Sequence, residues 1–318
     1  TVEKLFNEGA FVVTGELGPP KSVDTGVIDT KIAALRGAVD AVNITDNQTA
    51  VVRMSSWAAS LLLVQEGLEP NFQMVCRDRN RLAMQADILG GYTHGIRNML
   101  CLSGDHCMFG DHPDAMGVFD IDSMQLISMV KGMRDEGKFM SGGDIEEPPR
   151  MFIGAAANPF AEPFEWRVHR LAKKIEAGAD FIQTQYCFDV PRLRQFMERV
   201  RDLGLHERVF ILVGVGPLRS ERAAEYMRTK VPGVHIPDAV VERLRKTPKK
   251  QKRSEGKRIC VEIIQQVREI TGVAGVHVMA YRQEELVAEL IEEAGLLPRP
   301  MQSGWPEPPP EPRRQRRA

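Results

Sequence analysis

The chain has 318 residues, of which 42 are lysine or arginine and 43 are aspartate or glutamate, giving a net charge of −1. This length allows a large hydrophobic core and is typical of a single α/β barrel. The balanced charge gives no sign of a nucleic-acid partner or an anionic membrane, so a small-molecule ligand is favoured. No apolar run approaches the ~18 residues of a membrane span, and the first residues lack a signal-peptide layout, so we expect a cytoplasmic protein.

Short apolar runs alternate with segments of helical periodicity along most of the chain. The predicted strands cover residues 10–14, 41–45, 72–76, 98–102, 151–157, 181–185, 209–215 and 275–279. The predicted helices cover residues 27–35, about 56–66, 81–92, 123–134, 164–177, 191–203, a segment capped by Ser220, 237–244, 260–270 and a last segment ending near Gly295. A doubly wound sheet shows the same alternation, but eight strands at this length favour a closed (β/α)₈ barrel. We expect one domain over residues 1–298.

Three segments lie outside this repeat. Residues 107–119 form a long loop next to a predicted strand end and are a lid candidate. The basic segment 246–258 is interpreted as a solvated loop, with attraction of an acidic substrate tail as the alternative. Residues 299–318 are rich in proline and arginine and predict a disordered tail. Because the tail lacks interleaved aromatic residues, we expect no nucleic-acid binding.

The five cysteines are scattered and include no C-x-x-C pair, so we expect them to be reduced, buried and structural. Cys101 and Cys107 flank Asp105, but no histidine spacing accompanies them. We therefore predict no metal site.

Polar residues follow the predicted strands at their carboxyl ends, the edge at which α/β barrels bind ligands. Carboxylates at this edge transfer protons or stabilise charge, amides recognise the edge of a heterocycle, and an arginine suits a substrate carboxylate. Asp105 has an alternative role, since its position also suits the cap of the next helix. The residues expected at the mouth are Glu16, Thr45, Asp46, Gln73, Asp105, Asn158, Gln185 and Arg282.

Four segments resemble, in the same order, motifs of methylenetetrahydrofolate reductases of the short bacterial type. They are Thr-Gly-Glu-Leu-Gly-Pro-Pro at 14–20, Leu-Ser-Gly-Asp at 102–105, Ala-Gly-Ala-Asp-Phe-Ile-Gln-Thr-Gln-Tyr at 177–186 and Tyr-Arg-Gln-Glu at 281–284. The resemblance implies a (β/α)₈ barrel that binds FAD, with FMN as the alternative. It also implies reduction of 5,10-methylenetetrahydrofolate to 5-methyltetrahydrofolate.

The resemblance also implies roles for single residues. Glu16 would be the general acid that opens the five-membered ring of the folate, and Asp105 the carboxylate that stabilises the iminium charge beside flavin and pterin. Gln185 and Arg282 would contact the folate together with Asp105. The implied flavin contacts are Thr45, Gln73, Ser103, Gly104, Asp105, Asn158 and Lys174.

The sequence departs from the family pattern at positions that touch flavin in the family. Ser103 replaces an arginine, Gln73 a histidine, and Asn158 and Glu162 a tyrosine and a histidine. No G-x-G-x-x-G fingerprint is present. We therefore expect the chain to depend on a redox partner subunit, a ferredoxin or an NAD(P)H donor. The tail and the basic segment are candidate docking elements, with a solvated tail and loop as the alternative. We also expect an oligomer. The alternative function is a flavin-free folate-binding subunit, or a pterin-dependent methyltransferase on the same barrel.

Overall fold

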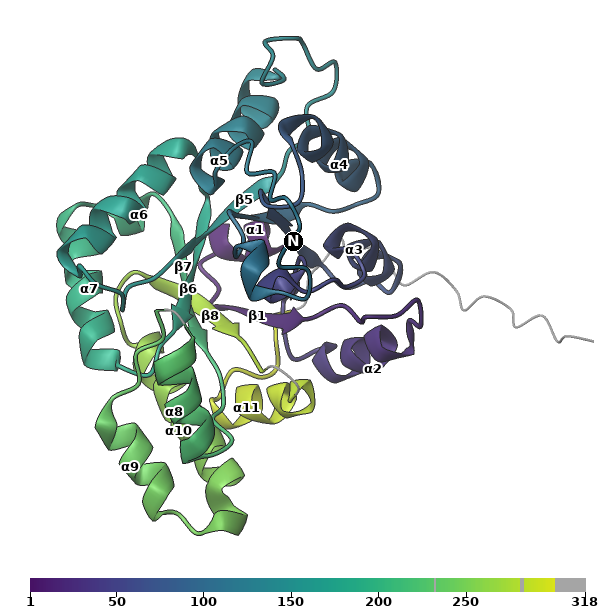
Figure 1. The fold of residues 1–318 in the computed structure, drawn as a ribbon. Helices are drawn as coiled ribbons and strands as arrows, with labels where there is room; N and C mark the ends of the chain where they lie inside the picture. The colour runs from purple at the N-terminus through teal and green to yellow at the C-terminus, as the bar shows by residue number, and fades with distance from the viewer. Residues whose placement is uncertain (232, 281–282, 301–318) are drawn as a thin grey trace, which may run out of the picture.

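The computed structural model describes residues 1–231, 233–280 and 283–300. Eight parallel strands pair in chain order, and the last pairs with the first, so the sheet closes into the predicted (β/α)₈ barrel (Figure 1). The strands are β1 (Val12–Leu17), β2 (Ala41–Ile44), β3 (Pro70–Val75), β4 (Asn98–Leu102), β5 (Phe152–Ala157), β6 (Phe181–Tyr186), β7 (Phe210–Val215) and β8 (Val273–Val278).

Helices surround the sheet, and α8, α9 and α10 all lie between β7 and β8 in the chain (Figure 1). The predicted caps Ser55 and Ser220 accept hydrogen bonds from the first turns of α3 and α8. None of the helices described is both long and apolar enough to cross a membrane. The helices are α1 (Val2–Asn7), α2 (Gly26–Leu35), α3 (Ser56–Gln65), α4 (Arg81–Thr93), α5 (Ser123–Lys131), α6 (Glu165–Ala177), α7 (Val190–Asp202), α8 (Glu221–Lys230), α9 (Asp238–Lys246), α10 (Lys252–Arg268) and α11 (Val287–Glu293).

Helix α1 closes the amino-terminal end of the barrel and was not predicted. Its apolar residues Val2, Leu5 and Phe6 pack with side chains from the interior of the strands. The ring of Phe6 stacks on Phe210, with centroids 4.6 Å apart. Six residues are too few for a periodic signal. Only the contact with the barrel identifies this helix.

Strand β1 extends beyond the predicted end. Gly15 and Glu16 pair in register with Val42 and Asn43, so the glycine lies within the strand instead of ending it. A Cβ on Gly15 would lie 3.1 Å from a methyl group of Leu35. The glycine therefore allows α2 to pack closely against the sheet, and Glu16 reaches the mouth from inside a strand.

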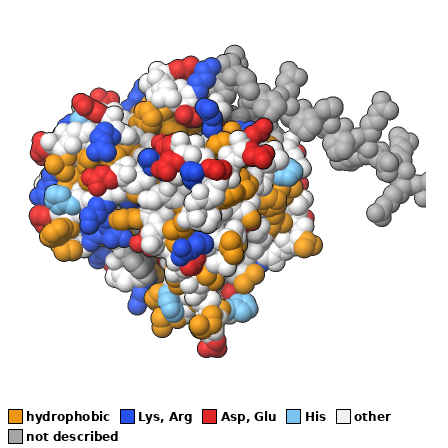
Figure 2. Space-filling view, turned by 90° about the horizontal axis from the view of Figure 1, so that it is seen from above, with side chains coloured by type: hydrophobic (Ala, Val, Ile, Leu, Met, Phe, Trp, Pro, Cys, Tyr) orange, Lys and Arg blue, Asp and Glu red, His pale blue; other side chains and the backbone are white. Residues whose placement is uncertain are grey.

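The interpretation of the basic segment 246–258 as a solvated loop is wrong, because α10 begins at Lys252. Lys252 forms an ion pair with Glu221 at 2.5 Å, and Arg253 pairs with Glu285 at 2.5 Å. Much of this charge is thus matched within the fold. Figure 2 likewise shows side chains of both charges interspersed over one face of the molecule.

The predicted tail also begins too early. Arg299 donates to the buried carboxylate of Asp40 at 2.5 Å and to the carbonyl oxygen of Phe11 at 2.7 Å. Its side chain is 8% exposed. The packed part of the chain therefore includes Arg299, and residues 301–318 lie outside the described residues.

Candidate active site

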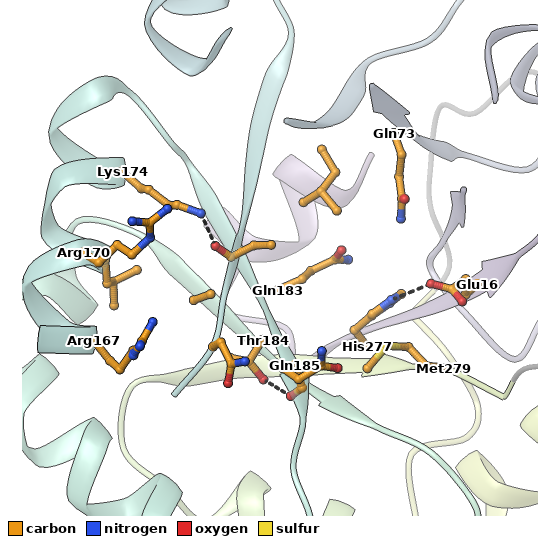
Figure 3. A pocket seen from close by; sticks show the side chains of 15 residues that line it. Glu16, Gln73, Arg167, Arg170, Lys174, Gln183, Thr184, Gln185, His277 and Met279 are labelled. Atoms are coloured by element: carbon orange, nitrogen blue, oxygen red, sulfur yellow. Dashed lines mark hydrogen bonds and ion pairs between the residues drawn. The ribbon is translucent and has the colours of Figure 1, made fainter. Parts of the chain in front are cut away.

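A cavity of about 360 Å³ opens at the carboxyl ends of the strands (Figure 3). It brings together five residues that the sequence places at the site: Glu16, Gln73, Asn158, Lys174 and Gln185. Prediction from strand ends missed several polar side chains that also line it. These are Arg167, Arg170, Gln183, Thr184 and His277.

The acid side of the cavity is a carboxylate and imidazole pair. The Nε2 atom of His277 on β8 lies 3.7 Å from Oε2 of Glu16 on β1. The Nδ1 atom of the same ring is 2.9 Å from the hydroxyl of Thr14. The side chain of Glu16 is 13% exposed and that of His277 4%, so the pair faces the cavity from a largely water-free wall. Figure 3 shows the two groups facing each other.

A chain of buried amides continues from this pair through the barrel interior. The amide nitrogen of Gln183 donates to the hydroxyl of Thr14 at 3.2 Å and to Oδ1 of Asn43 at 3.0 Å. Asn43 donates back to Gln183 at 2.6 Å, and Asn71 donates to Asn43 at 2.9 Å. Asn43, Asn71 and Gln183 each lie within a strand, so a buried amide in a strand marks a candidate member of the chain, but the sequence does not show which amides meet.

Helix α6 supplies the opposite, cationic side of the cavity. Arg167, Arg170 and Lys174 lie three and four residues apart, so they share one helix face. Lys174 is 8% exposed and donates to the carbonyl oxygen of Ala156 at 2.5 Å. Burial, aided by the charge of Arg170, lowers the pKa of Lys174 to about 8. Three cations converging on a cavity favour a ligand that bears phosphate.

Strand β6 changes register between Gln183 and Tyr186, and such irregularities re-aim side chains beside active sites. Within this stretch, Gln185 lines the cavity and its amide oxygen accepts from the backbone nitrogen of Tyr186. The hydroxyl of Tyr186 donates to the carbonyl oxygen of Met279 at 2.8 Å. Burial and the charge of Glu16 raise the pKa of this phenol, so it stays a donor.

Asn158 has a fixed orientation at the rim. Its amide oxygen accepts from the backbone nitrogen of Phe160 at 3.1 Å, and its amide nitrogen donates to the carbonyl oxygen of Gly233 at 3.1 Å. Gly233 has φ +75, and a Cβ there would lie 1.8 Å from the amide nitrogen of Asn158. The segment between α8 and α9 therefore approaches the cavity rim because residue 233 is a glycine.

Three predicted flavin contacts besides Asp105 lie outside the cavity lining. Thr45 is buried, and its hydroxyl finds no hydrogen-bond partner within the described chain. The hydroxyl of Ser103 accepts from the backbone nitrogen of Ser123 at 3.2 Å, which ties it to the start of α5. Gly104 has φ +87, and a Cβ there would lie 3.0 Å from Cβ of Val75. Gly104 thus serves the backbone turn after β4.

Asp105 lies on the exposed turn after β4, outside the cavity lining. Its backbone carbonyl accepts from the buried guanidinium of Arg77 at 3.0 Å. The alternative that Asp105 caps the next helix is wrong, because His106 caps the short helix Cys107–Phe109 and Asp122 caps α5. Its role near flavin and folate stays a prediction. Arg282 lies outside the described residues.

The loop 107–119 folds over the neighbouring loops. Asp111 accepts from the ammonium of Lys21 at 3.0 Å and from the backbone nitrogen of Val52 at 3.1 Å. The Lys21 and His112 contacts hold the pKa of the Asp111 carboxyl well below its usual range. The loop thus links three βα connections at the mouth, while its role as a lid stays a prediction.

The cysteines are buried as predicted, and burial raises the pKa of Cys76 and Cys260 to about 12. Among the described residues, no group of three or more His, Cys, Asp or Glu side chains is arranged to hold a metal ion.

Comparison with known structures supports the fold. An uncharacterized protein from Clostridium thermocellum that binds two copies of 5-methyl-5,6,7,8-tetrahydrofolic acid superposes with a TM-score of 0.59 at 15% identity, covering 93% of this chain and 98% of that chain. An F420-dependent secondary alcohol dehydrogenase superposes with a TM-score of 0.52 at 12% identity, covering 89% and 99%. At these identities the likeness establishes the barrel fold alone.

Comparison of sequences defines the family. A probable methylenetetrahydrofolate reductase (NADPH) of Caenorhabditis elegans is 23% identical over 93% of this chain, which spans only 44% of that protein. A 5,10-methylenetetrahydrofolate reductase of Pectobacterium carotovorum is 24% identical over 73% of this chain and 72% of that protein. The family model for methylenetetrahydrofolate reductase matches residues 1–295. The chain therefore belongs to the methylenetetrahydrofolate reductase family.

Proposed function

We propose that the protein reduces 5,10-methylenetetrahydrofolate to 5-methyltetrahydrofolate with a bound flavin. The main support is the distribution of charged groups around one cavity. The Glu16 and His277 pair lies on one side, and the cations of α6 lie on the opposite side. An acid is needed where the folate ring opens, and cations suit a phosphate-bearing cofactor.

Glu16 is the proposed general acid. In its protonated form it donates its proton to the folate nitrogen that leaves the one-carbon unit, and the ring opens to an iminium. The carboxylate that remains faces Nε2 of His277 at 3.7 Å, so an imidazole N–H is placed to stabilise the new charge. The amide of Gln185 is positioned on the same wall to orient the heterocycle, and Asp105 is the proposed anion for the iminium.

The residues present fit a flavin. The phosphate would be held by Lys174, Arg170 and Arg167, and the polar edges by the amides of Gln73 and Asn158. The buried Thr45 hydroxyl, which has no partner in the described chain, offers a further hydrogen bond. A reduced flavin, when bound, supplies the hydride for the iminium carbon. FAD is the proposed form, with FMN as the alternative.

The electron donor is proposed to be a partner redox protein. The flavin positions depart from the family pattern, and a partner that binds only the loaded protein stabilises it by mass action. The docking site is not assigned to the basic segment, because much of its charge is matched internally. The oligomeric state and cytoplasmic location stay predictions from the sequence.

The absorption spectrum of the purified full chain tests the proposal. We expect flavin absorbance, release of FAD or FMN on denaturation, and reduction of methylenetetrahydrofolate when the flavin is reduced chemically. A colourless protein that binds folate but does not gain reductase activity with added flavin would contradict it, and would favour the folate-binding subunit or methyltransferase.

A further inference from the structure

We propose that Gln183 is a positioning residue that sets the tautomer of His277, and through it the group presented to Glu16. The inference rests on the proposed function only in giving Glu16 the role of acid. Gln183 acts on Glu16 through Thr14 and His277. The tautomer of His277 is set by which atom donates at each step of this chain of hydrogen bonds.

The amide orientations agree with one another. Oδ1 of Asn43 accepts from both Asn71 and Gln183, while the Asn43 amide nitrogen donates to Oε1 of Gln183. Turning Gln183 alone would place oxygen against oxygen and nitrogen against nitrogen across this pair. In this network the amide nitrogen of Gln183 is the atom that faces the hydroxyl of Thr14.

The hydroxyl of Thr14 then has one direction left for its proton. It accepts from Gln183 at 3.2 Å and lies 2.9 Å from Nδ1 of His277. A hydroxyl carries one hydrogen, and the Gln183 nitrogen has no lone pair to accept it, so Thr14 donates to Nδ1. In a neutral imidazole whose Nδ1 accepts, the proton is on Nε2. That N–H faces the carboxylate of Glu16.

Burial makes this orientation persistent. Thr14, Asn43, Gln183 and His277 are each at most 3% exposed, so solvent offers no competing donors or acceptors. An Nε2–H favours the anionic carboxylate left after Glu16 has given up its proton, whereas a bare Nε2 would oppose it. The amide chain thereby assists the acid through His277.

The decisive variant is Gln183→Glu, which keeps the side-chain shape but replaces the donating nitrogen by oxygen. Thr14 then donates to residue 183, and His277 must donate from Nδ1, so the tautomer inverts. The readout is the ¹⁵N spectrum of histidine-labelled full chain at pH ~8, above the ordinary histidine pKa of about 6.5. Signals of His277 among the 7 histidines are assigned by their loss in His277→Gln.

We expect Nε2–H in the natural chain and Nδ1–H in Gln183→Glu, with folate turnover reduced roughly tenfold or more and flavin content unchanged. Gln185→Glu, two positions along the same strand, is the matched control for the spectrum and should keep Nε2–H. An Nδ1–H tautomer in the natural chain, or an unchanged tautomer in Gln183→Glu, overturns the inference.

Should Gln183→Glu not fold, Thr14 provides a second pair of variants. Thr14→Val removes the hydroxyl and should give mixed His277 tautomers, whereas Thr14→Ser retains it and should restore Nε2–H. Nε2–H alone in both variants also overturns the inference. These spectra require no folate turnover, so failure of this inference is distinguishable from failure of the proposed reductase activity.

Discussion

The ammonium of Lys174 lies 2.5 Å from the carbonyl oxygen of Ala156, a contact that joins α6 to the carboxyl end of β5 beside the cavity. Burial lowers the pKa of Lys174 to about 8, so the group is charged below that pH and neutral above it. A phosphate bound nearby would favour the charged form. Flavin affinity is therefore linked to the protonation of this lysine.

We expect flavin affinity to fall as pH rises through about 8, because Lys174 loses its charge there. Lys174→Met should weaken flavin binding roughly 10- to 100-fold, because a charge-assisted hydrogen bond contributes ~1.5–3 kcal/mol. Flavin fluorescence titrations from pH ~6.5 to ~9.5, which extend to either side of the Lys174 pKa, measure both effects. Lys173→Met, at the exposed neighbouring position, is the matched control. Equal affinity in the two variants would separate Lys174 from the flavin.

Glu16→Gln should preserve flavin binding and flavin reduction by an artificial donor but lose folate reduction by ~10²–10⁴, because an amide cannot donate an acid's proton. Rapid-reaction kinetics measure the two half-reactions separately. Folate turnover within a few-fold of that of the natural chain would remove Glu16 from the mechanism.

Asp105→Asn should lower folate turnover and raise the flavin reduction potential, because a neutral amide no longer opposes negative charge on the reduced ring. Redox titration and steady-state turnover are the measurements. Asp114→Asn, on the same exposed loop, serves as the control. An unchanged potential with normal turnover would show that the exposed turn does not approach the flavin.

The isolated chain, supplied with flavin, should oxidise NADH or NADPH slowly and gain activity with a partner redox protein. The physical reason is the altered set of flavin contacts together with the missing dinucleotide fingerprint. Steady-state kinetics of the pure protein provide the test. Rapid NADH- or NADPH-driven reduction of methylenetetrahydrofolate without another protein would exclude the partner.

Arg299→Met should lower the free energy of unfolding by about 3–5 kcal/mol, because the mutation removes the guanidinium that pairs with the buried Asp40 carboxylate at 2.5 Å. Urea denaturation measures the change. Arg36→Met is the control, since its pair with Glu66 is exposed and such pairs contribute ~0–1 kcal/mol. Equal losses in both variants would mean that Arg299 adds nothing beyond a surface charge.

Placing candidate residues at the carboxyl ends of predicted strands succeeded where the residue follows or ends an apolar run. Glu16 and Gln185 were placed at the mouth because parallel strands direct their carboxyl ends to one edge of the barrel. Arg167 and Arg170 were missed because they belong to a helix. Their spacing from Lys174 was visible, but only the fold shows which face of α6 turns toward the cavity.

The amide chain could not be predicted because its members meet only when the barrel closes. Gln183 and Thr14 are separated by 169 residues, and Asn43 and Gln183 by 140. Periodicity reports which side of a strand a residue occupies, not which distant strand it faces. The ion pair of Arg299 with Asp40 could not be predicted either, because the two residues lie far apart in the chain. The proline-rich composition after residue 298 instead favours an extended, solvated segment.

Thr14 and His277 stand 263 residues apart, on the first and last strands of the barrel. Their hydrogen bond forms only after β8 has docked between β7 and β1, and only then does the imidazole of His277 face Glu16. During synthesis, Glu16 is therefore added to the chain long before His277. Stabilisation of the Glu16 carboxylate by His277 becomes available only once synthesis has passed residue 278, and two fragments divided between β7 and β8 would regain it only by reassembling.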